Sequence, residues 1–104
     1  MELKDNTVET KSLAPQLVLA LFMAQEVYKE YGTDLVITSA NDSVHSYTSL
    51  HFSGNAVDLR TRSLPGTVDR AEVVTKIQNK LNQDFDVVLE QDHIHLEYQP
   101  KLRS

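Results

Sequence analysis

The chain contains no cysteine among its 104 residues. This absence excludes disulfide bonds, thiolate metal ligands and cysteine nucleophiles, so any bound metal must be held by His, Asp and Glu. It does not settle the compartment, because many exported bacterial domains also lack cysteine. A chain of this length forms one domain, residues 1–104, with enough apolar surface to fold without covalent cross-links.

Positive charge is also scarce. Ten Lys and Arg residues stand against fifteen Asp and Glu residues, which gives a net charge of −5. Nucleic-acid binding usually requires a basic surface that displaces phosphate counterions, so we expect no DNA or RNA partner. Long apolar runs are missing as well: none approaches a membrane span, and the segment MELKDNTVETKSL lacks the apolar core of a signal peptide. We therefore expect no membrane span, and the localisation stays unknown.

The segment SLAPQLVLALFMAQEVYKEYG, residues 12–32, predicts a helix. Ser12 is the expected N-cap, Pro15 suits the first turn, and Gly32 can close the C-terminus. Apolar side chains recur at helical spacing and extend around the segment: Leu13, Leu17, Val18, Leu21, Phe22, Met23, Ala24 and Tyr28. The width of this apolar surface predicts a largely buried helix, with binding of a partner helix or a membrane as the alternative.

The remaining segments predict four strands and a second helix. The strands are expected over residues 34–40, 55–61, 85–90 and 93–98, and the helix over 68–82, capped by Thr67 and buried along Ala71, Val74, Ile77 and Leu81. Gln91 and Asp92 form the two-residue gap of a hairpin between the last two strands. This order of elements predicts an α+β fold, a small antiparallel sheet with helices packed on one face, and residues 1–11 loosely ordered.

Strand alternation sorts the polar residues of the segment HIHLEY. It places His93, His95 and Glu97 on one face and Ile94, Leu96 and Tyr98 on the other. The apolar set belongs to the core, so the histidines face a groove or solvent. By themselves, two histidines at this spacing are more typical of an ordinary surface or of a structural pair than of a functional site.

Two segments together supply a possible metal site. SLHFSGNAVDLR contains His51 and Asp58, and DHIH contains His95. Catalytic zinc takes three protein ligands from His and Asp/Glu and leaves a position open for water, which these three residues would satisfy. Asp92, three residues before His95 and at a turn, could act as general base without being a ligand. Gly54 would allow the tight bend that this arrangement requires.

The same two segments resemble a known family. SLHFSGNAVD resembles the S-x-H-x-x-G-x-A-x-D signature of the zinc D-Ala-D-Ala carboxypeptidase and L-alanyl-D-glutamate endopeptidase family, with matches at Ser49, His51, Gly54, Ala56 and Asp58. DHIH resembles that family's second motif, in which an acidic residue stands three positions before a ligand histidine. The resemblance covers residues 36–98, which is most of the chain.

The resemblance implies a fold, a cofactor and a substrate class. Zn²⁺ would be held by His51, Asp58 and His95, with Asp92 as the acid/base and His93 orienting the substrate or the developing oxyanion. The implied fold is the family's small α+β sheet domain. The implied partner is peptidoglycan or another peptide containing D-amino acids, and we expect a monomer, although the sequence does not determine the oligomeric state.

One segment departs from the family pattern. Members carry a substrate-binding arginine in an SGYR-like segment after the first strand, whereas TSAND here has Asn41 and Asp42. Arg60 or Arg62 could replace it. The departure keeps a second hypothesis open, a non-catalytic zinc-binding module that binds peptide, cell wall or protein. A third is a metal-free structural domain whose motif matches are fortuitous.

Several further residues near the motifs have two interpretations. Glu90 and Glu97 could each hold a ligand imidazole in one tautomer, or could be solvated surface acids. His45 could be a replacement ligand or an exposed loop histidine. Tyr47 and Phe52 could form the wall of a peptide groove or could simply pack.

Overall fold

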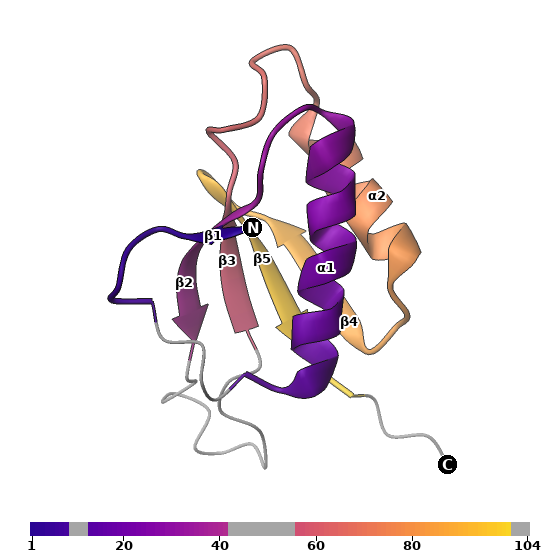
Figure 1. Ribbon diagram of the computed structural model, residues 1–104. Coiled ribbons are helices and arrows are strands. Elements are labelled where there is room, and N and C mark those ends of the chain that lie inside the picture. The colour runs from indigo at the N-terminus through magenta and orange to yellow at the C-terminus, as the bar shows by residue number, and fades with distance from the viewer. Residues whose placement is uncertain (9–12, 42–55, 101–104) are drawn as a thin grey trace.

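The computed structural model describes residues 1–8, 13–41 and 56–100. Its elements are β1 (Glu2–Leu3), α1 (Pro15–Glu30), β2 (Val36–Asn41), β3 (Ala56–Arg60), α2 (Arg70–Lys80), β4 (Phe85–Leu89) and β5 (His93–Tyr98). The strands of this described part form one five-stranded sheet in the order β1-β2-β3-β5-β4, and both helices pack on the same face (Figure 1). The predicted α+β fold with helices on a sheet is confirmed.

The sheet is mixed, so the prediction of a purely antiparallel sheet is wrong at one edge. β1 runs parallel to β2, with Glu2 opposite Val36, while the other neighbouring strands are antiparallel. Beyond β1, the amide of Lys4 donates to the carbonyl of Ile37 at 2.8 Å. The expectation that residues 1–11 are loosely ordered is therefore wrong for this strand. A two-residue edge strand is held by backbone hydrogen bonds and needs no apolar pattern in the sequence.

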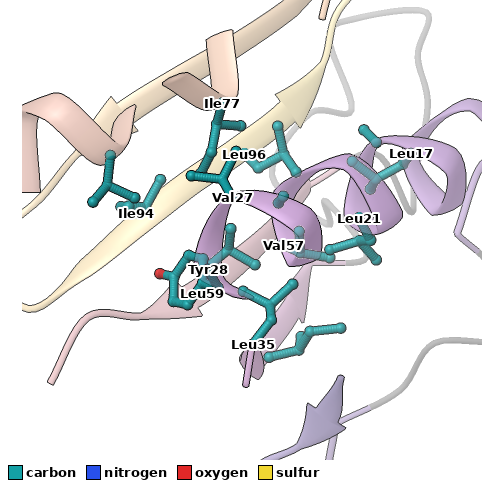
Figure 2. Close-up of a cluster of buried hydrophobic side chains, with 14 of the residues drawn as sticks. Leu17, Leu21, Val27, Tyr28, Leu35, Val57, Leu59, Ile77, Ile94 and Leu96 are labelled. Atoms are coloured by element: carbon teal, nitrogen blue, oxygen red, sulfur yellow. The ribbon is translucent and has the colours of Figure 1, made fainter. Parts of the chain in front are cut away.

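The core lies between the sheet and the two helices. Its largest buried side chains include Leu17, Val27 and Tyr28 of α1, Leu35 before β2, Val57 and Leu59 of β3, Ile77 of α2, and Ile94 and Leu96 of β5 (Figure 2). Strand alternation is confirmed, because Val57 and Leu59 of β3 and Ile94 and Leu96 of β5 are all buried in this core. The polar residues between them lie on the other face of the sheet, which neither helix covers (Figure 1) and which we call the open face.

Helix α1 is buried along one side only, so the prediction of a largely buried helix is wrong. Its first three turns carry apolar side chains on the outer side as well: Val18, Leu19, Phe22 and Met23 are 38%, 63%, 56% and 39% exposed. A helix that lies flat on a sheet buries only one stripe of its own surface. In α1 the apolar side chains extend around the helix past that stripe, so some of them remain exposed. No helix in the described part of the chain is long and apolar enough to cross a membrane.

The ends of α1 agree with the sequence prediction only in part. The helix begins after Ala14, which provides no side-chain cap, and Pro15 takes a first-turn position as predicted. The expected cap, Ser12, lies outside the described residues and two positions before the observed N-cap, Ala14. At the other end, Gly32 has a φ of 77°, a conformation that favours glycine and closes the helix as predicted.

Helix α2 begins later than predicted. Its cap is Asp69, whose carboxylate accepts from the backbone amide of Ala71 at 2.9 Å, and not Thr67. The reason is a turn immediately before it, closed by the amide of Val68 and the carbonyl of Pro65 at 3.0 Å. The buried side of the helix shifts accordingly: Val73 and Ile77 are buried, whereas Ala71 is exposed.

Strands β4 and β5 form the predicted hairpin. Leu89 lies opposite Ile94, and the amide of Glu90 donates to the carbonyl of His93 at 2.8 Å. Gln91 and Asp92 are therefore the two turn residues, as the spacing predicts. This turn holds Asp92 at the end of the strand that carries both histidines.

Candidate metal centre

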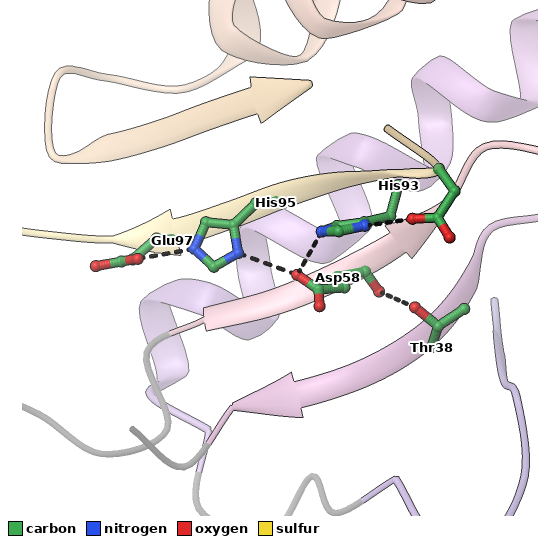
Figure 3. A network of polar contacts seen from close by, with 6 residues as sticks. Thr38, Asp58, His93, His95 and Glu97 are labelled. Atoms are coloured by element: carbon green, nitrogen blue, oxygen red, sulfur yellow. Dashed lines mark hydrogen bonds and ion pairs between the residues drawn. The ribbon is translucent and has the colours of Figure 1, made fainter. Parts of the chain in front are cut away.

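A row of polar side chains lies on the open face of the sheet. Its members are Thr38 of β2, Asp58 of β3, Asp92 of the hairpin turn, and His93, His95 and Glu97 of β5 (Figure 3). The row exists because the apolar residues of β3 and β5 alternate with polar ones, and the polar set of both strands falls on the same face. The hydroxyl of Thr38 donates to the backbone carbonyl of Asp58 at 3.3 Å, which ties β2 to the row.

Asp58 and His95 form the centre of this row. They stand directly opposite each other on the antiparallel strands β3 and β5. Oδ1 of Asp58 lies 3.0 Å from Nδ1 of His95, and the two side chains are 28% and 27% exposed. Two residues 37 positions apart thus become a partly buried carboxylate–imidazole pair. The contact is set by strand register, which brings directly opposite side chains together.

The second ring nitrogen of His95 faces Glu97. Nε2 of His95 lies 2.8 Å from Oε1 of Glu97, and Glu97 also accepts from the side-chain amide of Gln99. The hydrogen bond to Asp58, reinforced by the one to Glu97, raises the pKa of His95 to about 9. In the metal-free protein at neutral pH, His95 therefore donates a proton to a carboxylate on each side.

His93 links Asp92 to this pair. Its Nδ1 lies 2.8 Å from Oδ1 of Asp92, and its Nε2 lies 3.6 Å from Oδ1 of Asp58. The hydrogen bond from His93 holds the pKa of the Asp92 carboxyl below its usual range, although the Asp92 side chain is 89% exposed. Asp92 is thus ionised at neutral pH and separated from Asp58 by one imidazole ring.

The structure brings together some of the predicted site residues. Asp58 and His95, two of the three predicted ligands, are in contact, and His93 lies beside Asp58. Among the residues that the structure describes, Asp92 is connected to the pair through His93. The third predicted ligand, His51, lies outside the described residues, together with Ser49, Gly54, His45, Tyr47, Phe52 and Asp42.

Glu97 and Thr38 make contacts that sequence reasoning left open or missed. Glu97 was one of two candidate partners for a ligand imidazole, and its place two residues from His95 on the same strand face is the signal that favours it. Glu90, the other candidate, is an exposed residue next to the hairpin turn. The contact of Thr38 depends on the pairing of β2 with β3 and has no signal in the sequence.

The donor atoms of Asp58 and His95 fit part of a zinc site. Two ligands about 2.0–2.1 Å from a tetrahedral zinc ion stand roughly 3.3 Å from each other. The 3.0 Å between Oδ1 of Asp58 and Nδ1 of His95 approaches this spacing. Within residues 1–8, 13–41 and 56–100, no three His, Asp or Glu side chains form a metal-binding group by themselves. The pair therefore requires a further ligand, the role that the first motif assigns to His51.

Comparison of the chain with models of protein families, with curated proteins and with solved structures gave no match. The two motifs and the geometry of the open sheet face are therefore what can support a function for this chain.

Proposed function

We propose that the protein is a zinc-dependent peptidase that hydrolyses amide bonds in peptidoglycan stem peptides, of the D-Ala-D-Ala carboxypeptidase or L-Ala-D-Glu endopeptidase type. The observation that carries the proposal is the contact between Asp58 and His95. The two motifs assign both residues as ligands, and their donor atoms lie 3.0 Å apart. The mixed sheet with helices on one face agrees with the small α+β domain that the resemblance implies.

In this proposal His51, Asp58 and His95 hold the zinc ion. Zinc, when bound, polarises a carbonyl and makes hydroxide available near neutral pH. Glu97 accepts a hydrogen bond from Nε2 of His95 and so leaves Nδ1 as the nitrogen that faces Asp58 and the ion. A neutral imidazole ligand must first lose the proton that His95 carries in the metal-free protein, so binding releases that proton.

Asp92 and His93 would handle protons and orient the substrate. Asp92 is ionised at neutral pH, because its pKa is held low by His93, and it can accept a proton as general base. A general base of this kind contributes about 10²–10⁴-fold to the rate. Nε2 of His93 lies 3.6 Å from Oδ1 of Asp58, so this ring would border a substrate bound at the ion and help to orient it.

A second candidate is a non-catalytic zinc-binding module that binds peptide or cell wall. The observation that favours it is the placement of Asp92. This carboxylate is 89% exposed, and its hydrogen bond goes to His93 and not to the Asp58–His95 pair. A proton acceptor in that position has to move, or act through His93, to serve a reaction at the pair.

Zinc content and cell-wall digestion, measured on the same samples, test both candidates. We expect the wild type to bind one zinc per chain by elemental analysis and to release soluble peptides from purified peptidoglycan. His95→Ala should lose both properties, and Asp92→Asn should keep zinc while digestion falls by about 10²–10⁴-fold. Glu90→Gln is the matched control, an exposed carboxylate in the same hairpin, and should change neither.

The outcomes separate the hypotheses. Zinc binding without digestion in the wild type supports the binding module and overturns the peptidase. A wild type that binds no zinc overturns both and leaves the metal-free structural domain.

A further inference from the structure

Strand β4 forms one edge of the sheet, and within the described part of the chain no strand pairs with its outer side. The order β1-β2-β3-β5-β4 leaves β1 and β4 as the two edge strands (Figure 1). Edge strands present unpaired N–H and C=O groups, and natural sheets protect them with short strands, with Lys or Pro residues, or with bulges. β1 follows this rule, because it has only two residues and Lys4 comes directly after it.

Strand β4 lacks these protections. It is five residues long, with the sequence FDVVL, and contains no Lys, Pro or Gly. Its pairing with β5 runs without a register shift from Phe85 to Leu89, so no bulge turns the edge away from a partner. Val88 and Leu89, near its end, are 44% and 41% exposed. An apolar edge strand of this length is a surface on which another strand can pair.

The hydrogen bonds at the two ends of β4 show which of its residues bond to β5. The amide of Gln99 donates to the carbonyl of Asp84 at 2.6 Å. The amide of Glu90 donates to the carbonyl of His93 at 2.8 Å. Because hydrogen-bonded pairs alternate along an antiparallel ladder, every second residue between these ends also bonds to β5. The residues whose backbone groups bond to β5 are thus Asp84, Asp86, Val88 and Glu90.

The backbone groups of the intervening residues point outward, away from β5. Those of Phe85 are engaged: its amide donates to the carbonyl of Asn82 at 3.2 Å, and its carbonyl accepts from the side-chain amide of Gln78 at 3.2 Å. Those of Val87 and Leu89 have no partner among the described residues. Two N–H donors and two C=O acceptors therefore face outward two residues apart, which is the spacing that an added strand matches.

The side chains of this edge are apolar in the middle and acidic on both sides. Asp86, Val88 and Glu90 lie on the open face, because all three stand opposite the polar residues of β5. Val87 and Leu89 lie on the helix side of the sheet. A complementary strand consequently has apolar residues at its centre and a Lys or Arg opposite each of the two carboxylates.

A second copy of the same strand does not complement this edge. A two-fold axis can pair the outward groups of two copies in three registers, centred on Val87, Val88 or Leu89. In these registers carboxylates of the two copies meet: Asp84 opposite Glu90, Asp86 opposite Glu90, and, beyond the strand end, Asp86 near Asp92. Like charges directly opposite each other on paired strands are destabilising. The charges therefore favour a cationic segment of another protein over self-association.

We propose that the outer edge of β4 binds an extended segment of another protein, which adds a strand to the sheet. The segment pairs its backbone with Val87 and Leu89, and its Lys or Arg residues face Asp86 and Glu90. In this mode of binding the main-chain hydrogen bonds supply affinity and the alternate side chains supply specificity. The proposal does not depend on the peptidase proposal, because β4 would separate the bound segment from β3 and β5, which carry the candidate metal centre.

Titration of a designed peptide into ¹⁵N-labelled protein tests this edge. The probe is Lys-Val-Val-Ile-Lys, blocked at both ends, in which the two lysines and the middle valine fall on one face of a strand. We expect it to shift the amide signals of Val87 and Leu89 and to slow their hydrogen exchange. In the free protein these two amides should exchange faster than the amide of Val88, which bonds to β5.

Two control peptides separate charge from backbone pairing. Glu-Val-Val-Ile-Glu has the same apolar residues and the opposite charge. The lysine peptide N-methylated at its second and fourth residues keeps the charge and loses the N–H groups that would donate to the edge. Each control should bind about tenfold more weakly than the lysine peptide, or weaker still.

Substitutions at the edge test the same contacts from the side of the protein. Leu89→Pro removes an outward N–H that β5 does not use, so it should abolish binding and leave the pairing of β4 with β5 in place. Leu89→Val keeps this N–H and an apolar side chain, and should bind within about twofold of the wild type. Glu90→Gln should weaken binding about two- to fivefold. The free energy of unfolding of each variant shows whether it folds.

The outcomes either support or overturn the proposal. Binding that requires both the lysines and the N–H groups of the peptide supports it, and this comparison uses wild-type protein throughout. Equal binding of the lysine peptide and either control overturns it, as does no binding of the lysine peptide at millimolar concentration. Dimerisation of the protein in sedimentation, removed by Leu89→Pro, overturns it in favour of a second copy as the partner of β4.

Discussion

Replacing Glu97 tests whether its contact with His95 organises the proposed zinc site. Oε1 of Glu97 lies 2.8 Å from Nε2 of His95, and the Glu97 side chain is only 28% exposed, so solvent screens the contact incompletely. A hydrogen-bond acceptor that orients a metal-binding imidazole typically contributes about 10–100-fold to metal affinity, or about 1.4–2.8 kcal/mol. Glu97→Gln keeps an acceptor oxygen and loses the charge, so we expect a zinc Kd raised about tenfold. Glu97→Ala removes the acceptor as well and should approach about a hundredfold.

The assay is competition for zinc against a chromophoric chelator at neutral pH, with the unfolding free energy of each metal-free variant measured in parallel. Glu90→Gln is the control, since it removes a carboxylate from the exposed end of the same hairpin and should leave the Kd unchanged. An unchanged zinc Kd in Glu97→Ala would refute the reasoning. So would equal losses in the Gln and Ala variants, because the graded effect follows from the acceptor that Gln retains.

Three further predictions concern stability and pH. Tyr28→Phe removes the hydroxyl that donates to the carbonyl of Arg60 at 2.8 Å, and should lower the free energy of unfolding in urea by about 1 kcal/mol; no change would contradict this contact. Asp69→Ala removes the cap of α2 and should cost about 1 kcal/mol in the same assay, whereas Asp69→Asn, which keeps an acceptor, should cost less; equal losses would contradict the cap. Folding raises the pKa of His95 from 6.5 to about 9 in the metal-free protein. Protonated His95 therefore adds its full contribution to the free energy of unfolding below pH 6.5, and this contribution is lost as the pH rises through about 9. The imidazole is 27% exposed, so we expect the loss to be about 2–3 kcal/mol in chelator-treated wild type and absent in His95→Gln; parallel pH profiles of the two proteins would contradict it.

Period-two alternation made part of the candidate site predictable. Apolar residues at every second position of β3 and β5 fix which side of each strand faces the core, so the sequence predicts that Asp58 and His95 lie on the opposite side, as they do. Their contact was not predictable by this rule, because it depends on strand register. The structure supplies that register by pairing Asp58 with His95 and Arg60 with His93.

The failed predictions have identifiable physical causes. β1 is held by backbone hydrogen bonds to β2, and its two residues are too few to show an alternating apolar pattern in the sequence. Thr67 and Asp69 are both acceptable caps, and the turn closed at Val68 decides between them.

The hydrogen bond from Tyr28 to the carbonyl of Arg60 limits the freedom of the main chain at the end of β3. Tyr28 is fully buried in α1, so this strand end is fixed to the core from the helix side of the sheet. Fixing the backbone of a single residue costs about 1–2 kcal/mol of conformational entropy, and here folding has already met that cost. The core thus makes the strand end beside His93 rigid before any partner meets the other face of the sheet.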